Sequence, residues 1–314
     1  MGAKIVITSE YFGRFSPAGK ELLLANGFTV VDNPFQRLLR EEDMLGILDE
    51  AEGIIADLEP ITARVMAAAP KLKIIARRGV GVDSIDLEAA KARGIVVART
   101  PGAVEKPTAD LAMTFILTLA RRIPSLNEKM KNRVWEKELG SSLEGKRLGI
   151  AGLGNIGQAL VKRAQAFDME VVYYDPMRKE DKEQALGVTY LSWQELLKTS
   201  DFISLHLPLL PETKHIINYE TLKLMKNTAY LINTARGPIV NEADLARALK
   251  EGLIAGAGID VFAEEPTTTS PLMDAPNTIL TPHVATFTRE VFIKMDVMAA
   301  QNIVDYFQKG TCLT

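Results

Sequence analysis

Three side chains with reactive groups, Arg236, Glu265 and His283, stand shortly after apolar runs that are typical of β-strands. The carboxyl ends of parallel strands meet at one edge of a sheet, where open α/β folds bind their ligands. We therefore expect the three side chains to lie together. An arginine, a carboxylate and a histidine at one place supply what the reduction of a ketone by hydride requires.

Each of the three side chains suits one part of that reaction. Hydride delivery to a carbonyl carbon builds negative charge on the oxygen, and His283 is the expected proton donor because an imidazole titrates near neutral pH. Glu265, ahead of its neighbour Glu264, is expected to orient the imidazole ring and to favour its protonated form. Arg236 presents parallel N–H donors to a carboxylate, so we expect it to hold a 2-oxo acid and to polarise its carbonyl.

A glycine pattern earlier in the chain predicts a dinucleotide site. Gly152, Gly154 and Gly157 form GxGxxG between a strand-like run and the helical stretch 156–167. The glycines allow a tight turn, the approach of a pyrophosphate to the backbone, and close packing of helix on strand. The start of the helix offers unpaired N–H groups to the phosphates.

An acidic residue at the end of the next strand-like run predicts which dinucleotide binds. The carboxylate of Asp175 can accept hydrogen bonds from the hydroxyls of the adenosine ribose. The same negative charge would repel a 2′-phosphate, so we predict NAD rather than NADP. Arg178 is the competing feature, because its guanidinium can still reach a phosphate.

Short β-branched runs alternate with helical stretches along the chain, which predicts parallel sheets with helices on both faces. We expect a first series of strands at 4–8, 29–31, 53–56, 73–76 and 95–98, and a second at 146–151, 170–174, 202–206, 229–233, 255–261 and 278–281. Six strands complete a doubly wound sheet. The sequence therefore predicts an α/β fold with two doubly wound domains of Rossmann or flavodoxin type and an interdomain cleft.

Helical stretches mark the expected boundaries of these domains. The stretch 104–122 follows Thr100-Pro101-Gly102 and is long enough to pass from one domain to the other. The stretch 287–309 predicts one or two helices that return to the first domain. The expected domains are thus residues 1–100 with 286–314, and residues 101–285. Within the first, we expect a helix over 84–93 with Ser84 as its cap.

The composition is that of a globular protein and excludes several classes of partner. The 314 residues carry 37 basic and 40 acidic side chains, a formal charge of −3, so no global positive field gathers nucleic acid or an anionic membrane. The one cysteine, Cys312, cannot form an internal disulfide, and three histidines offer little for a zinc site. No run reaches the ~20 apolar residues that span a bilayer. We expect a cytoplasmic protein without metal, nucleic acid or membrane contacts.

Six segments extend over nearly the whole chain and carry a resemblance: ARRGVGVDSIDLEAAKARGIVV, GLGNIG, YYDP, INTARG, GIDVFAEEP and TPHVATFTRE. In this order and spacing they make the sequence similar to the D-isomer-specific 2-hydroxyacid dehydrogenase family, in particular to its phosphoglycerate dehydrogenase-like branch. The resemblance implies an NAD-dependent, homodimeric enzyme that interconverts a 2-oxo acid and its D-2-hydroxy acid. The implied candidate substrates are 3-phosphoglycerate, hydroxypyruvate and glyoxylate. The discontinuous domain is then the substrate domain, and the other binds NAD.

The resemblance also implies roles for individual residues. Arg236, Glu265 and His283 would be the catalytic residues. The backbone amides of a glycine loop would receive the substrate carboxylate, and glycines placed after a strand are independently suited to such an anion site. The loop consists of Gly79, Val80 and Gly81. The NAD contacts that the resemblance implies are Asn155, Ile156, Asp175, Leu207, Pro208, Thr234, Asp260 near the carboxamide, and Thr108.

Basic residues near the expected cleft depart from the family's pattern. Where the family commonly has Asn-Thr-Pro-Gly, this chain begins the segment with Arg99. With Arg77, Arg78 and Lys106 it predicts a cationic wall that selects a substrate with a second anion, unless most of these residues are solvated or paired with Glu105 and Asp110. The loop 56–60 is acidic where animal-type phosphoglycerate dehydrogenases resemble one another in supplying an arginine. That difference disfavours 3-phosphoglycerate.

Two other functions are compatible with the same fold. An NAD(H)-sensing, corepressor-like binding protein can keep the trio of Arg236, Glu265 and His283, although the long tails that would carry partner motifs are missing here. A formate or phosphite dehydrogenase is disfavoured, because the loop Gly79-Val80-Gly81 lacks the lysine that phosphite oxidation is expected to need.

Overall fold

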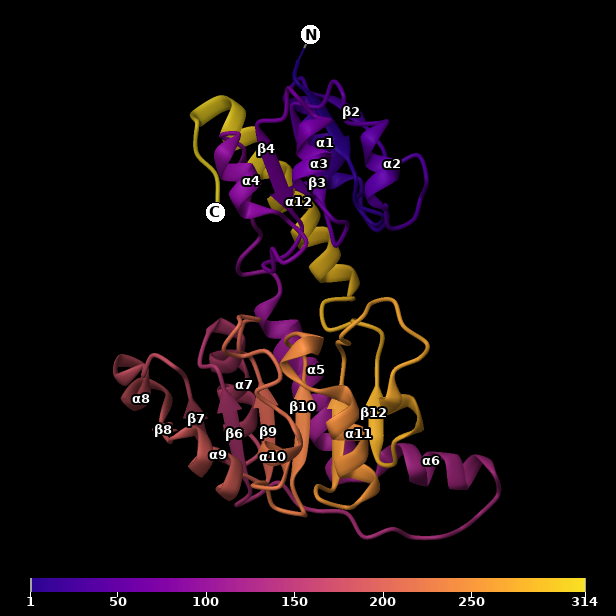
Figure 1. Ribbon diagram of the computed structural model, residues 1–314, viewed down its shortest axis with the longest axis vertical. Helices are drawn as coiled ribbons and strands as arrows, with labels where there is room; N and C mark the ends of the chain where they lie inside the picture. The colour runs from indigo at the N-terminus through magenta and orange to yellow at the C-terminus, as the bar shows by residue number, and fades with distance from the viewer. Residues whose placement is uncertain (1, 314) are drawn as a thin grey trace. The chain divides into compact units, whose positions relative to one another are not determined.

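The computed structural model describes residues 2–313, which form two compact units (Figure 1). Unit 1 contains the residues up to Val104 together with those from Phe287 onward, and unit 2 contains Glu105–Thr286. The chain leaves unit 1, builds unit 2 without interruption, and returns to complete unit 1. These divisions lie within a few residues of the boundaries that the sequence indicates.

Unit 1 is built on a five-stranded parallel sheet in the order β2-β1-β3-β4-β5. This is the order of flavodoxin-like folds, whose ligand edge lies at the switch between the first and third strands. The strands are β1 (Lys4–Ile7), β2 (Thr29–Val31), β3 (Gly53–Ala56), β4 (Ile74–Arg77) and β5 (Val96–Ala98), and the helices are α1 (Ala18–Ala25), α2 (Glu41–Leu45), α3 (Ala63–Ala67), α4 (Leu87–Ala92) and α12 (Arg289–Lys309).

Successive residues of the central strands pack on opposite faces of this sheet, as the pleat requires. In β1, Ile5 and Ile7 pack with α1 and α12, whereas Val6 packs with the layer of α2, α3 and α4. The C-terminal helix α12 is one continuous helix, and it supplies much of one apolar layer of unit 1 (yellow in Figure 1). Unit 1 is therefore discontinuous in sequence.

Unit 2 is built on a seven-stranded parallel sheet in the order β12-β11-β10-β9-β6-β7-β8. The order contains that of a Rossmann fold, with its switch point between β6 and β9. The strands are β6 (Arg147–Ala151), β7 (Glu170–Tyr174), β8 (Thr189–Tyr190), β9 (Phe202–Leu205), β10 (Tyr230–Asn233), β11 (Gly256–Ile259) and β12 (Thr278–Leu280), and the helices are α5 (Glu105–Ala120), α6 (Ile123–Lys131), α7 (Asn155–Gln165), α8 (Glu180–Leu186), α9 (Trp193–Thr199), α10 (Tyr219–Leu222) and α11 (Glu242–Lys250).

Helices cover both faces of the unit 2 sheet. The helices α5 and α7 pack on one face, and α9, α10 and α11 pack on the other. Helix α5 approaches β11 so closely that a Cβ atom at Gly258 would stand 2.7 Å from the Phe115 side chain. Because both faces are buried, the central strands read as continuous apolar runs rather than as alternating ones.

The structure differs from the sequence-based expectations at two places. The second sheet has seven strands rather than six, because β8 is only two residues long and carries no recognisable pattern. The helix expected to start at Ser84 begins at Leu87 and is capped by Asp86, whose Oδ1 accepts the amide of Ala89 at 2.9 Å. Ser84 is held instead in a turn, where its carbonyl accepts the amide of Ile61 at 2.7 Å. Every expected strand is present, with ends shifted by one or two residues at most.

Among residues 2–313, no helix combines the length and the apolar character needed to cross a bilayer.

Candidate active site

The three predicted catalytic residues follow three neighbouring strands of unit 2. Arg236 follows β10, Glu265 follows β11, and His283 follows β12, and these strands are adjacent in the sheet. The carboxyl ends of parallel strands lie at one edge, so the strand order alone brings the three loops together.

Glu265 and His283 are in direct contact. The Nδ1 atom of His283 lies 2.6 Å from Oε2 of Glu265, and the other carboxylate oxygen accepts the amide of Phe262 at 2.9 Å. Burial opposes ionisation of Glu265, but the hydrogen bond and charge of His283, the Phe262 amide and the charge of Arg236 outweigh it. Together they hold the pKa of Glu265 below its ordinary value. The carboxylate is therefore charged at neutral pH and can stabilise a protonated imidazole while leaving Nε2 available.

The loop that carries Arg236 is shaped by its neighbours. Asn233 bonds twice across this turn: its Oδ1 accepts the amide of Ala235 and its Nδ2 donates to the carbonyl of Arg236, both at 3.0 Å. The next residue, Gly237, packs directly on the Phe262 backbone, since a Cβ atom there would stand 1.9 Å from the Phe262 carbonyl carbon. This approach places the Arg236 loop beside the segment that leads to Glu265.

Asp260 was expected near the cofactor, and the structure shows that it also organises the His283 loop. Its carboxylate is fully buried and accepts hydrogen bonds from Thr281 Oγ1 at 2.6 Å, the amide of Val284 at 2.8 Å and the amide of Ala285 at 2.9 Å. His283 itself has a φ of +53°, a left-handed conformation that few residues other than glycine adopt. Sequence reasoning missed this role, because it depends on side-chain direction.

The expected dinucleotide turn has the geometry that a phosphate requires. A Cβ atom at Gly152 would stand 2.7 Å from the carbonyl oxygen of His206, and one at Gly157 would stand 2.3 Å from that of Gly152, so neither position accepts a larger residue. Gly154 faces open space instead. It precedes α7, which begins at Asn155 without a side-chain cap, so the first N–H groups of the helix remain available to an anion.

Asp175 lies at the end of β7, next to this turn. Its two carboxylate oxygens accept the amides of Leu153 and Met177, each at 3.0 Å, which fixes the side chain beside the glycine turn. Arg178, the competing feature, is held by Glu183 through two bonds of 2.8 and 3.0 Å. The guanidinium lowers the pKa of Glu183 to about 2. The arginine is therefore paired with a carboxylate at neutral pH.

The other expected NAD contacts follow strands of unit 2 or lie near the starts of α5 and α7. Thr234 directly follows β10, and its Oγ1 is buried without a hydrogen-bond partner in the described chain. Such an atom fits a site completed by a bound polar ligand. Leu207 and Pro208 follow β9, Ile156 lies in the first turn of α7, and Thr108 is buried in the first half of α5. The glycine turn, Asp175 and Thr234 together fit NAD.

The glycine loop expected to bind the substrate carboxylate lies in unit 1, after β4. Gly79 has a φ of +144°, and its amide and carbonyl both bond to Thr100, at 2.8 Å to Oγ1 and 2.9 Å from the amide. Its N–H is thus used by the fold. By contrast, the amides of Val80, Gly81 and Val82 have no partner in residues 2–313. The structure therefore moves the candidate anion site from 79–81 to 80–82.

The expected cationic wall is incorrect for two of its members. Arg78 is fully buried and forms ion pairs with Asp57 and Asp296 inside unit 1. The Arg77 side chain is only 8% exposed, and its guanidinium bonds to the carbonyls of Gly81, at 3.1 Å, and Arg78. Both arginines turn inward because buried carbonyls and carboxylates need their charge. Arg99 is partly exposed, and its guanidinium forms no ion pair within the described chain.

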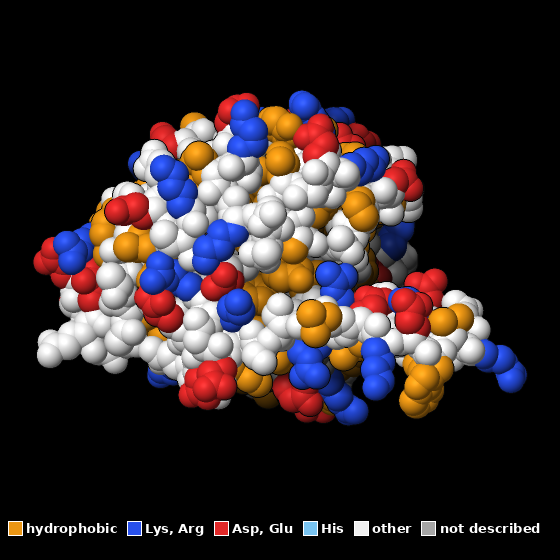
Figure 2. Space-filling view, turned by 90° about the horizontal axis from the view of Figure 1, so that it is seen from below, with side chains coloured by type: hydrophobic (Ala, Val, Ile, Leu, Met, Phe, Trp, Pro, Cys, Tyr) orange, Lys and Arg blue, Asp and Glu red, His pale blue; other side chains and the backbone are white. Residues whose placement is uncertain are grey.

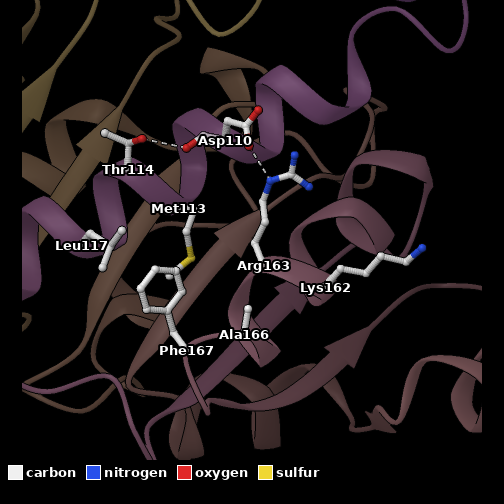
Figure 3. A pocket seen from close by; sticks show the side chains of 8 residues that line it. All are labelled: Asp110, Met113, Thr114, Leu117, Lys162, Arg163, Ala166 and Phe167. Atoms are coloured by element: carbon white, nitrogen blue, oxygen red, sulfur yellow. Dashed lines mark hydrogen bonds and ion pairs between the residues drawn. The ribbon is translucent and has the colours of Figure 1, made fainter.

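A surface hollow of about 390 Å³ lies between α5 and α7, away from these residues (Figure 3). It is lined by Met113, Leu117 and Phe167, and the ion pair between Asp110 and Arg163, at 2.6 Å, lies on one side. Phe167 follows the C-terminal end of α7, whereas the glycine turn precedes its N-terminal end. The hollow is therefore separate from the candidate active site.

Comparison with known proteins identifies the family. The model described as "D-isomer specific 2-hydroxyacid dehydrogenase, NAD binding domain" matches residues 113–285. The chain belongs to this family. It is an NAD-dependent oxidoreductase that acts on the CH–OH group of a 2-hydroxy acid. The expectations of fold class, family, cofactor and reaction are confirmed, whereas the roles of individual residues stay predictions.

Individual relatives agree with the family model. A glyoxylate reductase of Thermococcus litoralis is 46% identical over 261 residues, which are 80% of this chain and 78% of that protein. A D-3-phosphoglycerate dehydrogenase of Methanocaldococcus jannaschii is 42% identical over 269 residues, 85% of this chain and 51% of that protein. The solved structure of a D-lactate dehydrogenase from Aquifex aeolicus, complexed with NAD and lactic acid, has a TM-score of 0.85 and 31% identity, covering 98% of this chain and 96% of its own.

The contact between Glu265 and His283 predicts a pH effect. Glu265→Gln removes the negative charge that stabilises the protonated imidazole, so we expect the pH profile for 2-oxo acid reduction by the dehydrogenase to move toward lower pH. We also expect kcat to fall roughly tenfold or more. Steady-state rates between acidic and alkaline pH measure both effects. The control is Glu264→Gln, which removes the same charge one residue earlier. Equal shifts in the two variants would contradict the assignment.

The position of Asp175 predicts cofactor choice. Asp175→Ala removes the charge that repels a 2′-phosphate, so we expect the ratio of kcat/KM with NADPH to that with NADH to rise about tenfold or more. The ratio is the test, because the variant also releases the amide of Leu153. Asp181→Ala removes an exposed carboxylate from α8 and should leave the ratio unchanged. An unaltered preference for NADH over NADPH in Asp175→Ala would mean that this carboxylate does not determine the choice of cofactor.

Proposed function

We propose that this dehydrogenase reduces glyoxylate, or a 2-oxo acid of similar size, with NADH in the cytoplasm and as a homodimer. The inward position of Arg77 and Arg78 carries the substrate proposal. Both guanidinium groups are used inside unit 1, so neither can select a second anion on the substrate. The name of the Thermococcus litoralis relative, a glyoxylate reductase, supports the same choice.

Each residue of the proposed site has a defined part in the reduction. When bound, NADH supplies the hydride that reaches the carbonyl carbon. His283 gives a proton to the carbonyl oxygen through Nε2, since Nδ1 is held by Glu265, and the product is the 2-hydroxy acid. Glu265 keeps the imidazole oriented through its contact with Nδ1. Arg236 polarises the carbonyl and binds the carboxylate.

Unit 1 has backbone amides of its own that suit a substrate carboxylate. Gly79 and Gly81 have their carbonyls bonded inward, to Thr100 and to Arg77. In a trans peptide the carbonyl and the following N–H point in opposite directions, so the amides of Val80 and Val82 point away from those partners. Backbone N–H groups of a turn that are not used by the fold suit a carboxylate. Arg99 is then the one arginine of the expected wall that remains for recognition of a larger substrate.

A panel of 2-oxo acids assayed by the loss of NADH absorbance tests the proposal. We expect kcat/KM for glyoxylate and hydroxypyruvate to exceed that for 3-phosphohydroxypyruvate about tenfold or more, because a phosphate would lack buried cationic partners. His283→Ala should lower kcat by roughly 10²- to 10⁴-fold, as expected for loss of a general acid. His215→Ala, at an exposed histidine of the same unit, is the matched control.

Other outcomes of this panel have definite meanings. A preference for the phosphorylated substrate would overturn the choice of glyoxylate. Tight NADH binding without turnover of any 2-oxo acid would favour the nucleotide-sensing alternative. Full activity in His283→Ala would reject its role as proton donor.

The homodimer is supported by an apolar arm of unit 2, defined as α6 with the segment up to Gly140. Helix α6 has no buried residue. Large apolar side chains stand out along the arm, with Trp135 83% and Leu139 94% exposed. Figure 2 shows orange side chains among charged ones on this side of unit 2. Tryptophan and other large apolar residues are typical of the buried centre of an interface. A second copy of this chain would cover them.

Sedimentation velocity tests whether the arm forms the dimer interface. We expect the wild-type chain to sediment as a dimer and Leu139→Glu to shift toward monomer, because a carboxylate in an apolar interface loses its hydration. Leu24→Glu, at an exposed leucine of α1, introduces the same charge outside the arm and should remain dimeric. A monomeric wild type, or a dimer unaffected by Leu139→Glu, would contradict this assignment.

A further inference from the structure

Arg78 is a fully buried charge at the carboxyl edge of the unit 1 sheet, and the proposed reaction gives it no task. Its Nε donates to Oδ1 of Asp296 at 2.6 Å. Its Nη1 donates to Oγ of Ser9 at 3.0 Å and to Oδ2 of Asp57. A buried arginine without such partners would be strongly unfavourable, so these contacts fix the side chain in one orientation.

The contacts of Arg78 join segments from across unit 1. Ser9 follows β1, Asp57 follows β3, and Arg78 follows β4, which are three neighbouring strands of the sheet. Asp296 lies on α12 and also accepts the amide of Gly13 at 2.8 Å. One guanidinium thus connects the ends of three strands with the C-terminal helix.

The charges in this cluster favour an ionised arginine. Burial opposes the charge of Arg78, but Asp57 and Asp296 outweigh it and hold the pKa of the guanidinium above its usual value. The guanidinium also lies 5.1 Å from the centre of the Phe292 ring on α12, a distance that permits a cation–π contact. The pairing is geometrically specific, because the Nε and Nη1 donors are directed at different segments.

The cluster leads directly into the loop with available amides. Arg78 precedes Gly79, and its own amide donates to the carbonyl of Ala56 at 2.8 Å, which continues the register of β4 on β3. Two residues later, Val80 packs against the apolar cluster of Phe292 and Met295 on α12. Both ends of this short turn are therefore anchored to the same helix, one by charge and the other by apolar contact.

We propose that Arg78 is a positioning residue that holds the amides of Val80, Gly81 and Val82 in place for the substrate carboxylate, by tying the start of their loop to Asp57 and Asp296. This inference rests on the proposed function, in which those amides bind the substrate. Arg78 itself, fully buried, does not touch the ligand.

The test compares two ion pairs between the same two strands. Arg78→Met removes the pair with Asp57 at the carboxyl ends of β3 and β4. Lys73→Met removes the pair with Glu52, 2.8 Å long, which stands at their amino ends. We expect Arg78→Met to raise KM for glyoxylate about tenfold or more while kcat changes less than about threefold. The Kd for NADH, measured through the fluorescence of Trp135 and Trp193 in unit 2, should stay within about twofold in both variants.

A second variant keeps the test decisive if Arg78→Met does not fold. Asp296→Asn retains an oxygen for Nε of Arg78 but removes the charge, and it should raise KM in the same direction by a smaller factor. An unchanged KM in every foldable variant, or an equal rise in Lys73→Met, would overturn the inference while leaving the proposed function intact. A wild-type chain that reduces no 2-oxo acid would overturn the proposed function and the inference with it.

Discussion

The buried carboxylate of Asp260 fixes the backbone of the loop that carries His283. The position of the proposed proton donor in unit 2 depends on this interaction. Three hydrogen bonds from Thr281, Val284 and Ala285 end on its two oxygens, one from a hydroxyl and two from amides. A loop without them would be free to leave the left-handed conformation of His283, which L-residues adopt at a cost. The 2.6 Å contact with Glu265 thus depends on a backbone conformation that Asp260 helps to hold.

The two units use different forces to organise the same kind of sheet edge. In unit 2, a buried carboxylate satisfies backbone amides, and the loops approach one another where Gly237 leaves no side chain between them. In unit 1, a buried guanidinium joins carboxylates from distant segments. A carboxylate that accepts amides orders one loop locally, whereas an arginine with donors in several directions connects segments that are far apart in sequence.

What could be predicted from the sequence was set by local chemistry. The turn of Gly152, Gly154 and Gly157 is recognisable because the backbone there leaves no space for larger residues, and that demand appears directly in the residue types. The sequence does not predict the inward orientation of Arg78, because its partner Asp296 lies 218 positions away. No local pattern shows which way an arginine points. The helix cap moved from Ser84 to Asp86 for a similar reason: the contact of Ser84 with Ile61 is tertiary, and it keeps that stretch out of the helix.

The discontinuity of unit 1 has a consequence for the order in which the protein can be completed on the ribosome. Domains usually acquire their structure in the order of synthesis, from the N-terminus onward. Here the first 104 residues leave the exit tunnel long before α12, which carries both an apolar layer of their core and the counter-charge of Arg78. Unit 2 is contiguous and can mature during translation, while the five strands of unit 1 must wait, with apolar faces uncovered, until α12 has been made.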